Sequence, residues 1–182
     1  MSEINWNEIK ERIINSKSIV ITSHQSPDGD AIGSSLALHK YLNKIGVNST
    51  VVLPDSFPSF YNWMESSGVV IYYSEDEEKS TQLIKDAEIL FALDYNEPSR
   101  TGGMGKVVSE STAYKIMIDH HLNPSEFCDL TISNSQKCST AQMIFEFIES
   151  FGDIDLIDEN IGACVYTGLV TDTGSFRFSS VD

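Results

Sequence analysis

Short apolar runs rich in β-branched residues alternate along this chain with longer segments of amphipathic pattern. The short runs predict strands at 18–22, 49–53, 69–73, 89–93, 114–118 and 129–133. The amphipathic segments predict helices at 5–16, 31–45, 77–87, 139–151 and 159–170. Apolar strands that alternate with helices are typical of α/β domains. We therefore expect one α/β domain, with a mostly parallel sheet flanked by helices on both faces.

A few residues carry more local expectations. Asp30 is a candidate N-cap for the helix at 31–45, and Gly46 is its expected stop. His39 lies inside this helix beside Lys40, so we expect it to be exposed. Trp6 and Trp63 are interpreted as packing residues.

The composition supports a folded domain and narrows its partners. The chain has 182 residues, of which 41% are hydrophobic and 21% charged, enough to bury a core. Twelve basic against 27 acidic residues give a net charge of −15, which argues against binding duplex DNA. The sequence has no apolar segment long enough to span a membrane, and its three cysteines form no Cys-x-x-Cys motif. We also expect no signal peptide, because the first residues include no basic start and no apolar stretch. We expect a cytoplasmic protein with reduced thiols.

Acidic residues and histidines gather where several predicted elements end, and ligands of parallel sheets bind beyond the carboxyl ends of the strands. These residues are His24, Asp28 and Asp30 after the first strand, Asp94 after the fourth, Asp119, His120 and His121 after the fifth, and Asp172 at the end of the last helix. Each could alone be a cap or a turn residue. Together they predict one site at this edge, because four distant segments each supply an Asp or a His.

The charges indicate what such a site would hold. Asp28, Asp30, Asp94 and Asp172 would bring four negative charges together, which requires cations to neutralise them. Two divalent ions balance four carboxylates, and imidazole with carboxylate ligands suits Mn, Fe, Zn or Mg. Paired ions are the device used for in-line attack at phosphorus, and they attract phosphate to an acidic protein. We therefore expect a phosphate-directed two-metal site.

Four motifs resemble, in order, those of the DHH phosphoesterases. They are Ser23–Ser34, Asp94 with Arg100 and Gly102, Asp119-His120-His121, and Thr171–Phe178. The residues of these motifs are most similar to those of the NrnA-like branch, whose members degrade short oligoribonucleotides and dephosphorylate 3′-phosphoadenosine 5′-phosphate (pAp). Members normally continue into a DHHA1 domain, which we expect to be absent from this chain. Residues 1–182 are thus expected to be the catalytic DHH domain of a longer two-domain protein.

The resemblance implies a role for each motif residue. One metal would be held by His24, Asp28 and Asp94, and the second by Asp30, Asp94, His120 and Asp172. Mn²⁺ is the expected ion, with Mg²⁺ or Co²⁺ as substitutes. His121 would contact the phosphate or assist the leaving oxygen, with Asp119 fixing an imidazole tautomer.

Three further residues are candidates for binding substrate. Arg100 and Arg177 are candidate phosphate clamps, because a guanidinium group binds phosphate oxygens bidentately. The alternative for each is a surface salt bridge. Ser139 precedes a helix, where it could bind phosphate or simply act as an N-cap.

The resemblance implies a metal-dependent phosphohydrolase of short single-stranded RNA or pAp, acting through a hydroxide that bridges the metals. A pyrophosphatase or exopolyphosphatase is the alternative within enzymes. A metal- or nucleotide-binding module without catalysis is the non-enzymatic alternative. We expect a short RNA or small phosphorylated nucleotide as partner and no membrane, and a homodimer is left open.

Overall fold

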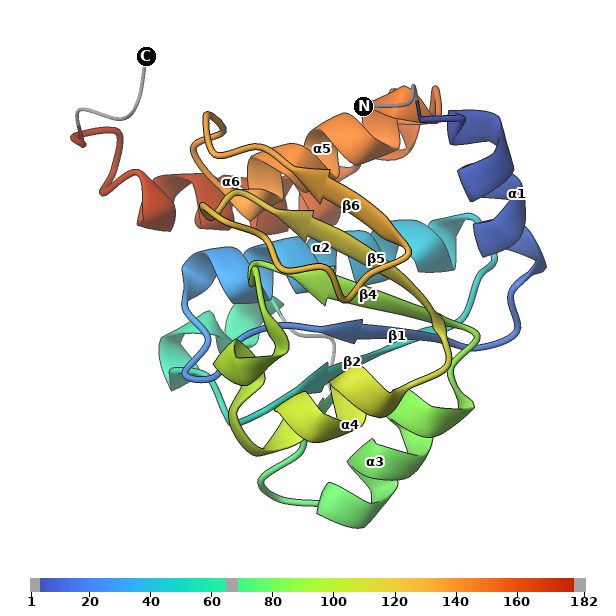
Figure 1. Cartoon of the computed structure of the whole chain (residues 1–182). Coiled ribbons are helices and arrows are strands. Elements are labelled where there is room, and N and C mark those ends of the chain that lie inside the picture. The colour runs from blue at the N-terminus through green and yellow to red at the C-terminus, as the bar shows by residue number, and fades with distance from the viewer. Residues whose placement is uncertain (1–3, 65–68, 179–182) are drawn as a thin grey trace.

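The computed structural model describes residues 4–64 and 69–178, and its centre is a six-stranded parallel sheet (Figure 1). The strands are β1 (Ile19–Thr22), β2 (Ser49–Leu53), β3 (Val70–Tyr72), β4 (Ile89–Leu93), β5 (Tyr114–Asp119) and β6 (Leu130–Ser133). Their order in the sheet is β3-β2-β1-β4-β5-β6, and each neighbouring pair is parallel. The predicted strands and their parallel pairing are confirmed. The strand order reverses between β1 and β4, and such a switch point is where parallel sheets bind ligands.

Helices cover both faces of the sheet, as predicted (Figure 1). The α-helices are α1 (Trp6–Asn15), α2 (Gly29–Lys44), α3 (Glu77–Asp86), α4 (Gly105–Glu110), α5 (Thr140–Ser150) and α6 (Glu159–Asp172). The described residues also form three 3₁₀ helices, which are η1 (Ser59–Met64), η2 (Pro98–Met104) and η3 (Ile154–Leu156). The sequence did not predict α4 or the 3₁₀ helices.

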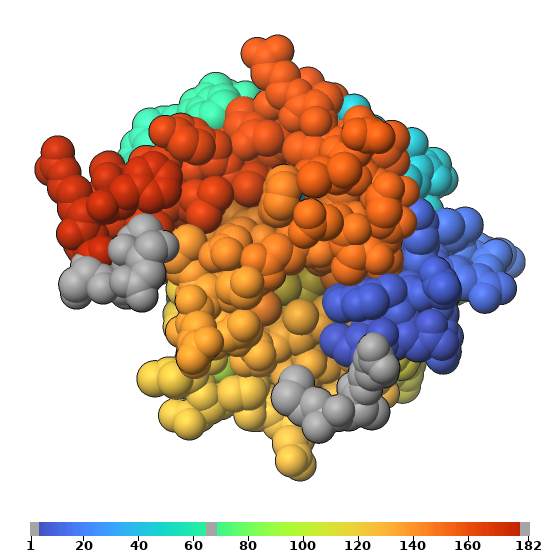
Figure 2. Space-filling model, turned by 90° about the horizontal axis from the view of Figure 1, so that it is seen from above, coloured from blue at the N-terminus to red at the C-terminus, as the bar shows by residue number. Residues whose placement is uncertain are grey.

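The two sheet faces belong to two separate cores, because side chains alternate along each strand. Ile19 and Ile21 of β1 face the core shared with α1, α2 and α5. Val20 of the same strand faces the core shared with α3 and α4. Helix α6 forms an outer layer on α2 and α5. Seen from above, α1, α5, α6 and the β5–β6 region form much of the visible surface (Figure 2).

The contact between α2 and α6 is close because glycines lie in it. A Cβ added at Gly33 of α2 would lie 2.5 Å from the carbonyl oxygen of Cys164 in α6. A Cβ at Gly29 would overlap the side chain of Thr171. The start of α2 and the end of α6 therefore approach each other more closely than larger residues would allow, which brings their polar residues together.

Three local expectations are corrected and two are confirmed. The N-cap of α2 is Asp28, not Asp30, since the Asp28 carboxylate accepts from the backbone N–H groups of Asp30 and Ala31. His39 is buried, not exposed, because α2 is covered almost all round. Trp63 is exposed rather than packed, whereas Trp6 packs on Phe147 and Phe151. Gly46, at φ 79°, ends α2 as predicted.

In the described part of the chain, every helix is too short or too polar to cross a lipid bilayer. The described cysteines Cys128, Cys138 and Cys164 are all free thiols.

Candidate metal centre

The six predicted ligands lie together at the switch point between β1 and β4. His24 and Asp28 lie in the loop after β1, and Asp30 lies in the first turn of α2. Asp94 directly follows β4, His120 directly follows β5, and Asp172 is the last residue of α6. Ligand-capable atoms of these residues form clusters in which all atoms lie within 4.8 Å of one another: His24, Asp28 and Asp94 in one, and Asp30, His120 and Asp172 in another.

Asp94 lies between the two clusters, with one carboxylate oxygen on each side. Its Oδ2 is 3.3 Å from Nε2 of His24, which in turn is 3.9 Å from Oδ1 of Asp28. Its Oδ1 is 3.6 Å from Nε2 of His120. The same nitrogen is 3.4 Å from Oδ2 of Asp172 and 3.9 Å from Oδ2 of Asp30. The two oxygens of Asp94 thus face different histidines, and the bridging role expected for Asp94 stays a prediction.

Hydrogen bonds fix the tautomers of His24 and His120. Nδ1 of His24 lies 2.8 Å from the carbonyl oxygen of Gln25, and Nδ1 of His120 lies 3.2 Å from that of Lys137. A carbonyl oxygen only accepts, so both Nδ1 atoms carry the proton. In the neutral rings Nε2 is therefore the nitrogen with a free lone pair, and it is the one that faces the carboxylates. Metal-binding histidines are oriented in the same way by such partners.

Asp30 is buried and is held by the start of α5. Its Oδ2 accepts from the backbone N–H of Thr140 at 2.6 Å, and its Oδ1 accepts from that of Ala141 at 2.8 Å. Asp30 therefore satisfies the first N–H groups of α5 rather than capping its own helix. The favourable field of a helix N-terminus adds to these bonds. The arrangement fixes one candidate ligand to an element 110 residues further along the chain.

Thr140 is a site residue whose role the sequence did not predict. Its hydroxyl donates to Oδ1 of Asp94 at 2.9 Å, so it steadies the carboxylate shared by both clusters. The position of Thr140 at a helix start was visible in the sequence, but its contact with Asp94 was not. Asp94 itself has φ 62°, a left-handed conformation that Asp tolerates better than most residues. Its backbone N–H donates to the carbonyl oxygen of Ile118 in β5.

The electrostatics of the protein alone favour a cation at this site. Burial and the charge of Asp94 raise the pKa of Asp30 well above its usual range, despite the bonds from α5. Burial also raises the pKa of Asp172; His120 opposes this shift, and the charges of Asp94 and Asp28 reinforce it. Burial would lower the pKa of His24, but the hydrogen bond and charge of Asp94 outweigh it and raise the pKa. These shifts show crowded negative charge, which divalent ions would relieve, so the residues fit such ions.

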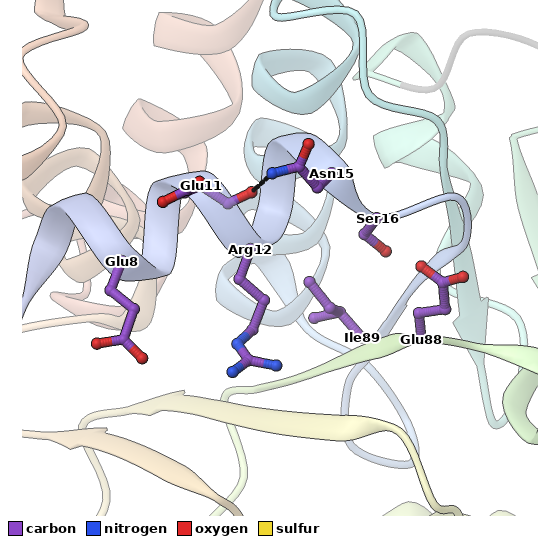
Figure 3. A pocket seen from close by; sticks show the side chains of 7 residues that line it. All are labelled: Glu8, Glu11, Arg12, Asn15, Ser16, Glu88 and Ile89. Carbon is purple, nitrogen blue, oxygen red and sulfur yellow. Dashed lines mark hydrogen bonds between the residues drawn. The ribbon is translucent and has the colours of Figure 1, made fainter.

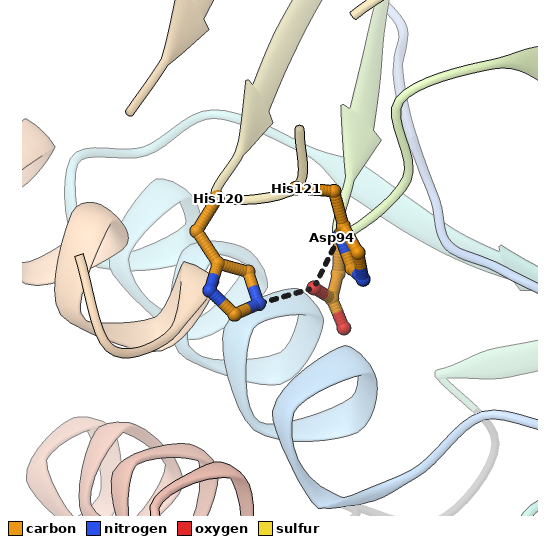
Figure 4. A group of neighbouring side chains, drawn as sticks. All are labelled: Asp94, His120 and His121. Carbon is orange, nitrogen blue, oxygen red and sulfur yellow. Dashed lines mark ion pairs between the residues drawn. The ribbon is translucent and has the colours of Figure 1, made fainter. Parts of the chain in front are cut away.

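His121 faces the same site but is held differently (Figure 4). Its Nδ1 is 2.7 Å from Oδ1 of the fully buried Asp119, and 3.7 Å from Oδ1 of Asp94. Since Asp119 is its nearest partner, Nε2 is left free for a ligand. The hydrogen bond to Asp119 raises the pKa of His121, although burial and the charge of Arg100 oppose the shift. The charge of Arg100 thus acts on His121, and a contact between Arg100 and phosphate stays a prediction.

The other two predicted substrate residues are placed less directly. Ser139 is buried and is the N-cap of α5, where its hydroxyl accepts from the backbone N–H of Gln142. The N-cap alternative is thus confirmed, and a phosphate contact by Ser139 stays a prediction. Arg177 is exposed, beyond the end of α6. It follows residues 174–176, which all have φ values near +60°. Its contact with phosphate also stays a prediction.

A hollow of about 360 Å³ lies at the opposite end of the sheet from these ligands (Figure 3). It is lined by Glu8, Glu11, Arg12, Asn15, Ser16, Glu88 and Ile89. Arg12 packs over the ring of Tyr114, 4.2 Å from its centroid. Because this hollow shares no residue with the clusters, we place the candidate chemistry at the switch point instead.

A parallel α/β sheet with carboxylate–histidine clusters at its switch point fits a domain that binds divalent metal ions. The match to a known family is specific: the model of the DHH family, N-terminal domain, matches residues 18–169. This chain therefore belongs to the DHH family, and the matched residues are its N-terminal domain.

Individual relatives agree with this assignment. The chain is 37% identical over 163 residues to the bifunctional oligoribonuclease and PAP phosphatase NrnA of Thermus thermophilus, covering 89% of this chain and 45% of that protein. It is 26% identical to the cyclic-di-AMP phosphodiesterase PdeA of Listeria monocytogenes, covering 92% of this chain and 26% of that protein. The crystal structure of an exopolyphosphatase-related protein from Bacteroides fragilis matches with a TM-score of 0.93 and 38% identity, over 97% of this chain and 52% of that one. This chain thus spans about half the length of the Thermus thermophilus and Bacteroides fragilis proteins.

Proposed function

We propose that this domain is a two-metal phosphohydrolase that cleaves short oligoribonucleotides, dephosphorylates pAp, or does both. The observation that carries the proposal is Asp94, whose two oxygens face Nε2 of His24 on one side and Nε2 of His120 on the other. The similarity to an oligoribonuclease and PAP phosphatase supports these substrates.

The residues around Asp94 would hold the two ions. His24, Asp28 and Asp94 would hold one; Asp30, Asp94, His120 and Asp172 would hold the other. Mn²⁺ suits this mixture of imidazole and carboxylate, and Mg²⁺ or Co²⁺ would substitute for it. Such ions, when bound, acidify water and stabilise the negative charge that develops at phosphorus.

The remaining residues would handle protons and charge on the substrate. Asp119 holds the His121 ring through Nδ1, so Nε2 of His121 would face the phosphate. Held in this orientation, His121 would donate a proton from Nε2 to the leaving oxygen. Arg100 would bind phosphate oxygens through its guanidinium group. The free thiols also support the reducing, cytoplasmic location that we propose.

The test is hydrolysis of di- to pentanucleotide RNA and of pAp with added Mn²⁺. We expect the unmodified chain to turn over at least one of these, and Asp94→Asn to lose both turnover and tight Mn²⁺ binding. Asp86→Asn, at the exposed end of α3, is the matched control and should behave as the unmodified chain does. Full Mn²⁺ occupancy in Asp94→Asn would contradict the bridging role.

Hydrolysis of pyrophosphate or polyphosphate is the second candidate. It is favoured by the likeness to the exopolyphosphatase-related protein from Bacteroides fragilis. Release of phosphate from pyrophosphate, with no turnover of RNA or pAp, would select this candidate. Two bound Mn²⁺ ions without turnover of any of these compounds would instead favour the binding module without catalysis.

A further inference from the structure

Exposed apolar side chains are concentrated around the end of the sheet that carries the metal centre. In the described residues they include Phe60 and Trp63 on η1, Leu122 after His121, and Phe176 and Phe178 beyond α6. Single exposed apolar residues need no explanation, but a group beside a polar site indicates a binding surface. The residues of η1 are the best defined members of this group.

The 3₁₀ geometry of η1 separates an inner from an outer face, because side chains three residues apart eclipse each other. Tyr61 and Met64 form the inner face: Met64 is buried, and Tyr61 packs against the main core. Phe60 and Trp63 form the outer face and are 68% and 63% exposed. The rings of Phe60 and Tyr61 also contact each other, with centroids 4.3 Å apart. The exposed rings of Phe60 and Trp63 are therefore carried by a helix whose opposite face packs on the core.

Two contacts place η1 beside the metal centre. The segment before it is tied to the loop after β1, because the Asp55 carboxylate accepts from the backbone N–H of Ser26 at 2.8 Å. The side chain of Asp28 is 59% exposed, so the metal centre is open to solvent at this ligand. η1 also packs against α2 and α6, which carry Asp30 and Asp172.

We propose that the outer face of η1, formed by Phe60 and Trp63, stacks the nucleobase of the substrate. This inference rests on the proposed function, because it needs a substrate that carries a base next to its phosphate. Aromatic side chains stack on any base, so they give affinity without requiring a particular sequence. They also give affinity without positive charge, which matters for a chain with only 12 basic residues and a net charge of −15.

Tryptophan fluorescence tests the stacking independently of turnover. The chain has two tryptophans, and only Trp63 lies on this face; Trp6 packs against Phe147. AMP and ribose 5-phosphate serve as ligands that differ only in the base, and both are titrated onto the Mn²⁺-loaded chain. We expect AMP to quench the fluorescence and ribose 5-phosphate to leave it unchanged. Trp63→Phe should remove the quench and keep the Kd for AMP within about twofold, since Phe also stacks.

Binding variants complete the test. Phe60→Ala combined with Trp63→Ala should weaken AMP about tenfold and leave ribose 5-phosphate unchanged. Ile14→Ala, which removes an exposed apolar side chain on α1, should change neither. Unchanged AMP affinity in the double variant, at an unchanged Tm, would overturn the proposal. A shift from dimer to monomer with unchanged AMP affinity would also overturn it and assign the face to a second copy of the chain.

The measurements distinguish an error in the stacking proposal from an error in the proposed function. Turnover of RNA or pAp with an unchanged KM in the double variant refutes the stacking and leaves the function standing. Quenching by AMP in a chain that hydrolyses neither substrate supports the stacking and refutes the function.

Discussion

Gly168 provides a sharp test of how the metal centre is built. This residue of α6 faces the Asp30 carboxylate of α2, and a Cβ at this position would lie 2.6 Å from Oδ1 of Asp30. The same Cβ would overlap the methyl group of Ala141. Because ordinary contacts begin at about 3.4 Å, α6 and the carboxylate would have to separate by roughly 0.8 Å. Asp30 would then move away from the two N–H groups of α5 that hold it.

The size of the effect follows from opposing contributions. Forcing a methyl group into a packed interface costs about 1–3 kcal/mol. Each hydrogen bond to a charged group that is disturbed costs up to about 1.5–3 kcal/mol. Alanine is favoured over glycine inside a helix by about 1 kcal/mol, which partly offsets these losses. We expect Gly168→Ala to lower the free energy of unfolding by about 3 kcal/mol, or roughly 6–12 °C in Tm for a chain of this length.

Gly162→Ala is the matched control, because it makes the same substitution in the same helix where an added Cβ would meet no atom. It should raise stability by about 1 kcal/mol through helix propensity alone. Chemical unfolding of the two variants, together with calorimetric titration of Mn²⁺, compares them directly. If Gly168→Ala were as stable as Gly162→Ala and bound Mn²⁺ equally well, the close packing of α6 on Asp30 would be refuted.

Three other substitutions test separate parts of the structure. Thr140→Val removes the hydroxyl that donates to Asp94 and keeps the side-chain volume nearly constant. It should lower the free energy of unfolding by about 1.5–3 kcal/mol and weaken Mn²⁺ binding. Unchanged Mn²⁺ affinity would show that this hydroxyl does not support Asp94. His121→Ala should still bind two Mn²⁺ ions and lower kcat by about 10²–10⁴-fold, and loss of one ion in calorimetry would make His121 a ligand instead. Burial and the charge of Lys40 lower the pKa of His39 below its ordinary 6.5, so the unfolded chain binds a proton more readily and stability should fall as the pH drops below about 6.5. His39→Gln should flatten that part of the urea-unfolding profile, and a profile identical to that of the unmodified chain would contradict the assignment.

The strands and main helices could be predicted because their pattern is local. Leu90-Phe91-Ala92-Leu93 is apolar at every position, which suits a strand covered on both faces. Helix α4 was missed because it begins at Gly105, after two further glycines, and glycine is a poor helix former. Gly105 is nevertheless required there, since a Cβ would lie 2.5 Å from the carbonyl oxygen of Pro98. A tertiary contact thus outweighs the local preference.

The candidate ligands could be predicted from their residue types, but their supports could not. The sequence pointed to Asp30 as the cap of α2, but in the fold Asp28 caps this helix and Asp30 bonds to the distant start of α5. The hydroxyl of Thr140 is similarly ordinary until folding places it against Asp94. His39 looked exposed because it neighbours Lys40, but Ser49 and Asn43 satisfy its ring inside the protein. In each case the deciding partner is a three-dimensional neighbour, which one sequence does not reveal.

The bond between Asp30 and the start of α5 has a consequence for local motion. Helix ends usually fray, so their first amide hydrogens exchange with solvent rapidly. The amide hydrogens of Thr140 and Ala141 are instead bonded to a buried carboxylate on another helix. They should exchange only in openings that separate α5 from α2, in which the Asp30 carboxylate loses the two N–H groups that hold it. Deuterium uptake at these two residues therefore measures how often Asp30 loses its support from α5.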